Sequence, residues 1–308
     1  MNRRIPSSRL SRAYFSNAPH KAAAMGGNAF MFIRDLPLGI MPSMRRQADY
    51  SVRLEPSDTN CEDWIVELLA IGDRYHREGL GEAWAAFVEQ VTGDIAYDGE
   101  AFFEIVSSTD DGVSSTSLVV LPSGEVREQS DAFVQVIPTA DRGDGPAEIV
   151  IPRANIWHIT IPSALGTPES HRKMIANLAA LSSPMPDFAL NSGNMGADDG
   201  FEFEANRHSM DIAIESVTRR WGTIPSLQQI KGTTEYFFIA RRLQFAHAQA
   251  LLREHVLREF NTLLVRLNCS SQLTVHGVPT ASQLAEALVK LERGEIGFTD
   301  AMASAKLD

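Results

Sequence analysis

Cysteine is scarce in this chain, and long apolar runs are missing from it. Two cysteines, Cys61 and Cys269, occur in 308 residues. They make no disulfide framework and have no metal-ligand spacing. We interpret both as ordinary buried or half-buried thiols that fit a reducing compartment. No stretch approaches 18 consecutive apolar residues, so we expect no membrane-spanning helix.

The sequence also lacks the short motifs that mark common catalytic and cofactor sites. It has no GxxxxGKS or GxxxxGKT phosphate loop, no GxGxxG dinucleotide pattern, no HExxH zinc motif and no GxSxG nucleophile elbow. We therefore expect no cofactor, no bound metal ion and no enzymatic activity.

Three weaker patterns involve histidine and acidic residues. His158 lies at the end of a predicted strand, where it could act as a base. No nucleophile or carboxylate stands at a telling spacing, which favours a structural role. His247 and His255 are eight residues apart on one helix, too far to share a metal ion. The acid pairs at 110–111 and 198–199 could be loose cation ligands or solvated loops, and they lack the EF-hand pattern.

Charge is divided unevenly along the chain. Residues 1–34 hold six basic residues and no acidic one, whereas the other residues hold 22 basic and 39 acidic residues, a net charge of −17. A basic arm on an acidic body could contact nucleic acid or an acidic neighbour, could be a solvated terminus, or could imitate a mitochondrial transit peptide. The candidate contact residues of this arm are Arg3, Arg4, Arg9, Arg12 and Lys21.

Apolar spacing in the first half predicts two helices followed by a series of short strands. The first helix is expected to begin with Asn60 as N-cap and to end near Gly79, and the second to run from about 82 to 97. The expected strands are 101–106, 115–121, 132–137, 148–151 and 155–159. A meander of short strands packed on helices is an α+β arrangement.

The second half is predicted to be mainly helical. One helix begins at Thr167-Pro168 and reaches about Leu181, and another runs from about 207 to 221. A helix of about 34 residues follows, from Thr234 to Leu267, with apolar residues on two sides. Both sides must be buried, either within the subunit or against a neighbour. Shorter elements are expected at 201–205 and 273–276 as strands and at 281–291 and 298–303 as helices.

Taken in order, several of these segments resemble the portal proteins of tailed bacteriophages. Residues 97–106, with the sequence YDGEAFFEIV, are similar to a family segment usually written yGnAYieiv, although Glu100 and Phe102 replace its Asn and Tyr. Residues of four later segments also resemble segments of this family: 151–159, 212–225, 234–267 and 288–300. The similarity covers about residues 60–300, and the part from 166 to 207 is much shorter than is usual.

The resemblance implies a portal-like fold, with a wing of short strands on helices, a compact helical stem with a short clip, one long helix and a small helical crown. The implied segments are an N-terminal arm and lead-in at 1–59, the first part of the wing at 60–166, stem helices at 167–221 with the clip at about 184–205, a tunnel loop at 222–233, the long wing helix at 234–270 and the crown at 271–308.

The resemblance also implies a ring, normally of twelve copies, at a capsid vertex of a virion that is assembled in the host cytoplasm. Double-stranded DNA would pass through its channel without sequence specificity. Other implied partners are the terminase large subunit, the major capsid protein and the head–tail adaptor, with no membrane. The tunnel loop would present Thr223, Gln228, Gln229 and Lys231 to DNA. The clip would dock partners through Asn191, Asn194, Asp198 and Asp199.

Two other functions stay open at this point. The chain could be another virion connector, such as a head–tail adaptor, which would bind a portal ring and would not assemble alone. It could also be a soluble α+β enzyme with a site around His158. The acidic body favours a conduit, because affinity for DNA comes largely from Lys and Arg neutralising phosphates.

Overall fold

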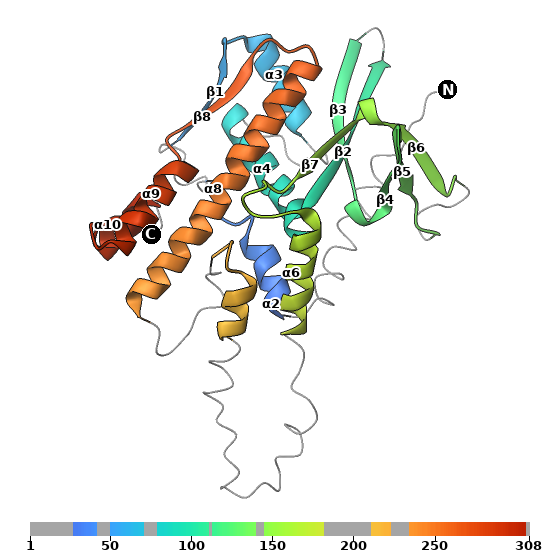
Figure 1. The fold of residues 1–308 in the computed structure, drawn as a ribbon. Coiled ribbons are helices and arrows are strands. Elements are labelled where there is room, and N and C mark those ends of the chain that lie inside the picture. The colour runs from blue at the N-terminus through green and yellow to red at the C-terminus, as the bar shows by residue number, and fades with distance from the viewer. Residues whose placement is uncertain are drawn as a thin grey trace, which may run out of the picture.

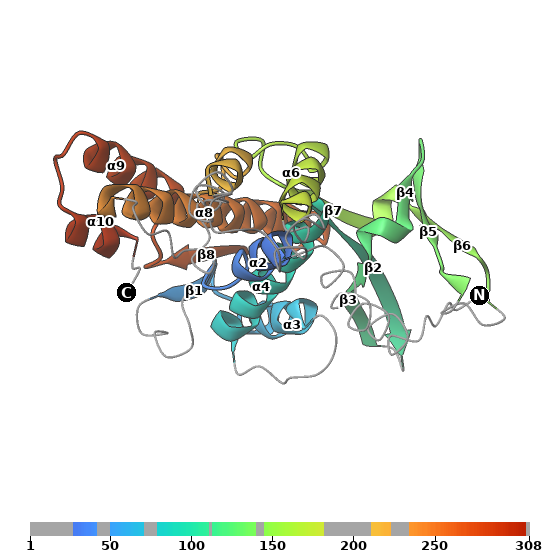
Figure 2. The same cartoon turned by 90° about the horizontal axis from the view of Figure 1, so that it is seen from below.

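The fold combines one long helix, several shorter helices and small antiparallel sheets, and the α+β class expected from the sequence is confirmed. The long helix α8 (Glu235–Arg266) crosses the molecule, with the C-terminal helices and a two-stranded sheet on one side of it and the two three-stranded sheets on the other (Figure 1; Figure 2). The computed structural model describes residues 27–41, 50–70, 79–110, 113–139, 145–181, 211–222 and 234–305.

Both ends of α8 are fixed by local sequence, and both lie within a residue of the predicted bounds. At the start, the Thr234 side chain accepts a hydrogen bond of 3.2 Å from the Phe237 backbone N–H. At the end, Asn268 adopts a left-handed conformation with φ of 62°. The backbone N–H of Cys269 then donates to the Leu264 carbonyl at 2.9 Å, which closes a Schellman motif.

The two apolar sides of α8 are buried within the subunit. The first half of the helix packs Ile239 and Leu243 against α9 (Ala281–Glu292) and α10 (Phe298–Ser304). The second half turns a different side to the main core. Packing inside one chain therefore accounts for both apolar stripes, and no neighbouring subunit is needed to cover them.

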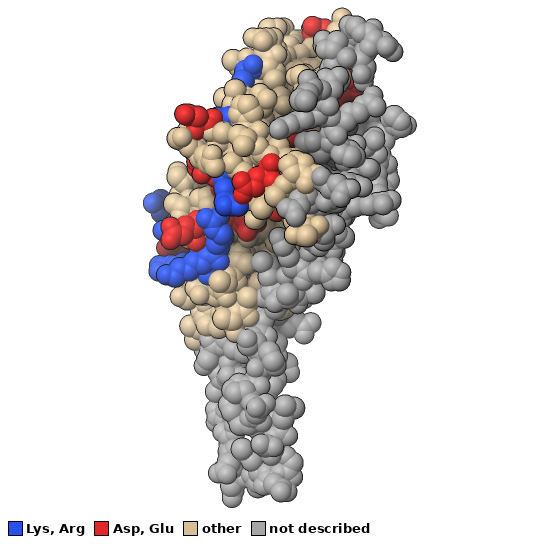
Figure 3. Space-filling model, turned by 90° about the vertical axis from the view of Figure 1, so that its right-hand side faces the viewer, with Lys and Arg blue, Asp and Glu red and all other residues tan. Residues whose placement is uncertain are grey.

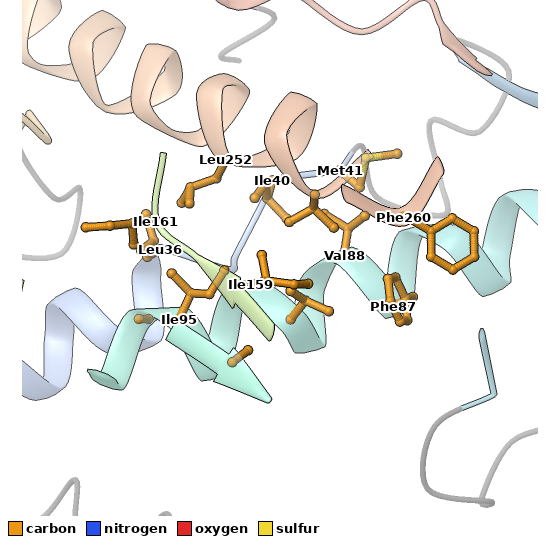
Figure 4. Packing of buried hydrophobic residues seen from close by; sticks show 14 of the residues in the cluster. Leu36, Ile40, Met41, Phe87, Val88, Ile95, Ile159, Ile161, Leu252 and Phe260 are labelled. Carbon is orange, nitrogen blue, oxygen red and sulfur yellow. The ribbon is translucent and has the colours of Figure 1, made fainter. Parts of the chain in front are cut away.

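The main core lies between α8 and α4 (Leu80–Asp98), with α2 (Gly27–Asp35) and α3 (Thr59–Leu69) around them. Val88 of α4 and Leu252 of α8 lie with Ile159 in one apolar layer (Figure 4). At one end of this layer the Phe87 ring stacks on Trp157, with ring centroids 5.8 Å apart. Aromatic and branched side chains together fill the space between the two helices.

The helix α3 differs from its prediction at both ends. Its N-cap is Asp58 and not Asn60, because the Asp58 carboxylate accepts hydrogen bonds from the backbone N–H groups of Asn60 and Cys61. Asn60 therefore lies inside the first turn. The helix ends at Leu69, well before the expected end near Gly79.

All five strands expected in the first half are present, although their ends differ by up to four residues. Two three-stranded antiparallel sheets form, with orders β3-β2-β7 and β4-β5-β6. Phe102 of one sheet meets Phe133 of the other with ring centroids 5.7 Å apart. The strands are β2 (Glu100–Asp110), β3 (Val113–Leu121), β4 (Val126–Glu128), β5 (Ala132–Val136), β6 (Glu148–Pro152) and β7 (Ile156–Thr160).

Two elements before residue 60 were not expected from the sequence. The helix α2 inserts Phe32 into the core, where its side chain is fully buried. The strand β1 (Ser51–Glu55) pairs antiparallel with β8 (Gln272–His276), which comes from the other end of the chain. Among the helices that the structure describes, none has the length and apolar character needed to cross a bilayer.

Candidate functional site

The side chains predicted to contact DNA or partners fall outside the described residues. This holds for Thr223, Gln228, Gln229 and Lys231 of the tunnel loop, for Asn191, Asn194, Asp198 and Asp199 of the clip, and for Arg3, Arg4, Arg9, Arg12 and Lys21 of the arm. The structure does describe the segments that flank the predicted clip and the predicted tunnel loop in the sequence. They are α6 (Pro168–Ala180), the helical segment 211–222 and the start of α8.

The helix α6 and the segment 211–222 lie side by side, with α2 next to both (Figure 1; Figure 2). The start of α6 is the predicted one. Thr167 accepts a hydrogen bond from the Ser170 N–H, and the Ser170 hydroxyl accepts one from the Thr167 N–H, which forms a capping box in front of Pro168. The helix α6, which precedes the predicted clip, therefore has a first turn that is fixed by its own neighbouring residues.

An aromatic cluster joins these three helices. Trp221 is 2% exposed, and its ring meets Phe32 of α2 edge to face at a centroid distance of 5.4 Å. It also meets the ring of His171 of α6 at 5.3 Å. Burial of a tryptophan between two other helices stabilises this junction. The cluster lies directly before Gly222, where the predicted tunnel loop begins.

Gly222 is the first residue of the predicted tunnel loop and the last one described before Thr234, and it lies against the backbone of α8. Its φ is 88°, and a Cβ atom there would stand 2.6 Å from the Arg241 carbonyl oxygen and closer still to the Phe245 nitrogen. Neither the conformation nor the space suits another residue. A side-chain contact supports this approach, because the Gln244 amide donates to the Arg219 carbonyl at 2.8 Å.

A buried chain of hydrogen bonds also links α8 to the turn that ends at Gly222. The Arg241 guanidinium donates to the Thr218 hydroxyl at 3.1 Å, and that hydroxyl donates to the Ile214 carbonyl at 2.8 Å. Arg241 is 6% exposed, and burial lowers the pKa of its guanidinium, while Glu215 opposes that shift. The segment 211–222 is thus anchored to α8 by backbone contact and buried polar groups, and to α2 and α6 by aromatic packing.

His171 anchors the helix α6, and the sequence analysis did not predict this role. Its Nε2 atom lies 2.9 Å from the Ala96 carbonyl of α4, and its side chain is 1% exposed. Burial lowers the pKa of this imidazole below its ordinary value. Close packing of α6 on the end of α4 needs a glycine, because a Cβ atom on Gly99 would lie 2.9 Å from Pro168 Cα.

The structure gives His158 neighbours that the sequence could not supply. Its ring stacks on Phe102, the residue directly opposite in the sheet, with centroids 4.2 Å apart. Its Nε2 atom lies 2.9 Å from one oxygen of Glu100, and Arg172 donates to the other oxygen at 2.8 Å. Glu100 thus links β2, β7 and α6.

The electrostatics of this cluster favour an ion-pair network over a catalytic base. Burial alone would raise the pKa of Glu100, but hydrogen bonds from His158 and Arg172 outweigh that effect and lower it. Both carboxylate oxygens are engaged. Within the described part of the chain, His158 contacts Glu100, Phe102 and Phe133, and none of these supplies a hydroxyl or thiol nucleophile. Within the described residues, no group of three or more His, Cys, Asp or Glu side chains is placed to hold a metal ion.

The sheet β4-β5-β6 carries ion pairs of exposed side chains on its surface. Arg127 pairs with Glu148 at 3.1 Å, and Arg153 pairs with Glu128 at 2.8 Å. On the face seen in Figure 3, basic and acidic side chains of the described residues lie next to one another. Neighbouring charges of opposite sign offset one another on this face, and the exposed charges are screened over about 10 Å at 0.1 M salt.

Comparison with known proteins gives a fold but no family. No protein family and no curated protein matches the chain. A solved structure described as the neck of an empty GTA particle, computed with C6 symmetry, contains a chain of similar fold; GTA stands for gene transfer agent. The two chains are 14% identical and superpose with a TM-score of 0.53, over 94% of this chain and 93% of the other. The likeness therefore spans nearly the whole of both chains and concerns the fold.

Proposed function

We propose that this chain is a portal subunit, a structural component of a phage-like virion that forms a ring at a capsid vertex and conducts double-stranded DNA. The observation that carries the proposal is the fold shared with a chain from a virion neck over nearly the full length of both. The resemblance of the sequence segments to portal proteins is independent support, because it was drawn from residue patterns and not from the fold.

The anchored segments support the same assignment in physical terms. A conduit needs loops of defined position on a rigid frame. Here α6 and the segment 211–222, which flank the proposed clip, pack on α2, α4 and α8 through Trp221, His171 and Gly222. The proposed tunnel loop begins at Gly222 and joins α8 at its N-cap Thr234. Loops positioned by a rigid scaffold commonly carry function.

The assembly state tests the proposal directly. We expect the purified chain to form rings with a central hole and a mass near twelve times 33.9 kDa, seen by mass photometry and negative-stain microscopy. Rings that form only on a pre-existing portal would favour the head–tail adaptor. A chain that stays monomeric and is missing from purified virions would contradict both connector functions.

The tunnel-loop assignment has its own test. Replacing Lys231 with Glu reverses a charge that we propose touches the DNA backbone, so packaged DNA per particle should fall while rings persist. The matched control is Lys290→Glu, the same charge reversal on α9, where Lys290 pairs with Glu286. Equal DNA content in both variants would argue against this loop as a DNA contact.

The clip assignment is tested by deletion. Removing residues 191–196 should leave ring formation intact and weaken docking of the terminase large subunit and the head–tail adaptor. Pull-down of either partner by rings of the deletion variant measures this loss. Full docking would place the partner surface elsewhere; incorporation into capsids through the major capsid protein should be unchanged in either case.

A further inference from the structure

The two cysteines of the chain lie next to each other in the folded protein. Their Sγ atoms are 2.9 Å apart, although the residues are separated by 208 positions in the sequence. A disulfide bond is about 2.05 Å long, so the two sulfur atoms need to approach by less than about 1 Å to bond. Both are free thiols in this structure, and both side chains are half-buried. A small oxidant can therefore reach them.

The backbone of each cysteine is held in place by its own helix terminus. Cys61 lies in the first turn of α3, where its N–H donates to the Asp58 cap. Cys269 lies just past the end of α8, where its N–H closes the Schellman motif on Leu264. The juxtaposition of the two thiols thus follows from two well-defined helix ends.

A third contact joins the two connections that carry the thiols. The strand β1 ends beside the start of its antiparallel partner β8, with Glu55 opposite Gln272. Just beyond that pair, the Ser271 hydroxyl donates to the Pro56 carbonyl at 2.9 Å, and Ser271 is 2% exposed. Pairing of the strands and this buried hydrogen bond keep the thiols together whether or not they are bonded.

We propose that Cys61 and Cys269 form a dithiol–disulfide pair, which a small-molecule disulfide such as oxidised glutathione closes into a bond joining α3 to the end of α8. The inference concerns a modification site and does not rest on the proposed function. The net reaction consumes one small disulfide and two cysteine thiols, and it yields the protein disulfide and two small thiols. The protein dithiol is oxidised, the small disulfide is reduced, and the two thiol protons go to the two leaving thiolates.

The exchange proceeds in two steps. Burial, followed by the hydrogen bond to Cys269, raises the pKa of the Cys61 thiol to about 11. A raised pKa lowers the thiolate fraction at neutral pH, so mildly alkaline pH favours the exchange. One cysteine first bonds to one half of the small disulfide and expels the other half as a thiolate. The second cysteine then loses its proton and attacks the sulfur atom of the first, which expels the second small thiol.

The test uses the full chain in its native assembly, reduced and then incubated with oxidised glutathione at mildly alkaline pH. With two cysteines in the sequence, the wild type should lose both titratable thiols together and two hydrogen masses by intact mass spectrometry. Its melting temperature should rise by about 5–10 °C, because the bond constrains a long loop of the unfolded chain. Cys61→Ser and Cys269→Ser, each with one cysteine left, should instead carry one bound glutathione and show no such rise.

Three outcomes would overturn the inference. The wild type could accumulate glutathione on either cysteine without expelling it, retain both thiols, or form disulfide-linked dimers on a non-reducing gel. A double Cys61→Ser, Cys269→Ser variant serves as the fold control, and its melting temperature should match that of the reduced wild type. These outcomes are independent of whether rings form, so failure here leaves the proposed function untouched.

Discussion

At the scale of single residues, Gly222 combines a left-handed backbone with direct contact to the next helix. Gly222→Ala should destabilise the fold by about 3 kcal/mol or more, because the new methyl group meets backbone atoms of α8 that cannot rotate away. The matched control is Gly93→Ala in the interior of α4, where a Cβ atom meets nothing within 4 Å. Alanine there should stabilise by about 0.5–1 kcal/mol. Denaturant unfolding of both variants measures the contrast, and a neutral Gly222→Ala would refute the anchoring role.

Asp94 is a second residue whose burial predicts a measurable effect on stability, in this case one that depends on pH. It lies buried in α4, and within the described residues its Oδ2 atom has no hydrogen-bond partner. Burial, with a smaller contribution from Asp98, raises the pKa of this carboxyl well above its ordinary value. The folded state therefore binds a proton that the unfolded state releases above about pH 4, and stability falls as the pH rises from there to the folded pKa.

It follows that Asp94→Asn should be more stable than the wild type at pH 7, by on the order of 1–3 kcal/mol. The advantage should shrink as the pH falls and vanish below about pH 4, where the carboxyl becomes neutral in both states. Thermal unfolding of both proteins from about pH 3 to pH 8 measures this. Asp131→Asn, an exposed site between β4 and β5, should show no such trend. A less stable Asp94→Asn variant at pH 7 would mean that the buried carboxylate is ionised and paired.

At the scale of elements, α8 serves two separate cores. Leu243 belongs to the smaller core with α9 and α10 and is fully buried. Leu243→Ala should cost about 2–5 kcal/mol, with the loss concentrated in those two helices. Hydrogen exchange should then show faster exchange in α9 and α10 and unchanged protection in α4. Val265→Ala, at a position that is 62% exposed near the other end of α8, should have little effect. Uniform loss of protection would mean that the two cores unfold as one unit.

The elements that the sequence predicts well are those whose ends are set by neighbouring residues. Thr234 and Thr167 lie directly before their helices and cap them, and Gly99 ends α4 in a left-handed conformation. The cap of α3 was missed because Asp58 and Asn60 are both good cap residues two positions apart, and only the path of the chain decides between them.

The contacts that could not be predicted are those that join distant parts of the chain. Glu100 meets His158 only because β2 pairs with β7 in one particular register, which no local pattern encodes. The pairing of β1 with β8 and the meeting of Cys61 with Cys269 depend in the same way on how the two ends of the chain come together. The aromatic junction around Trp221 likewise gathers three helices from separate regions.

At the scale of the whole molecule, the division of charge predicts which part of the chain would contact DNA in the proposed function. The residues beyond position 34 carry a net charge of −17 and repel phosphates, whereas the arm carries basic residues only. Replacing Arg3, Arg4, Arg9, Arg12 and Lys21 with Gln should therefore abolish weak, sequence-independent binding of duplex DNA. In the unchanged protein, log Kd should vary with log salt with a slope of at most about 4.5, since each neutralised phosphate contributes about 0.9. Fluorescence anisotropy with a labelled duplex between 50 and 200 mM salt measures the slope.

A control of equal charge separates a contact of the arm from an effect of net charge. Five basic residues of the body, Arg127, Arg153, Lys173, Lys290 and Arg293, can be replaced with Gln together, and four of them already pair with acids. Exposed ion pairs contribute about 0–1 kcal/mol each, so this variant should stay folded. If DNA contacts the arm, the control keeps the steep salt dependence and the arm variant loses it. Equal loss in both variants would mean that the net charge of the molecule, and not the arm, determines binding.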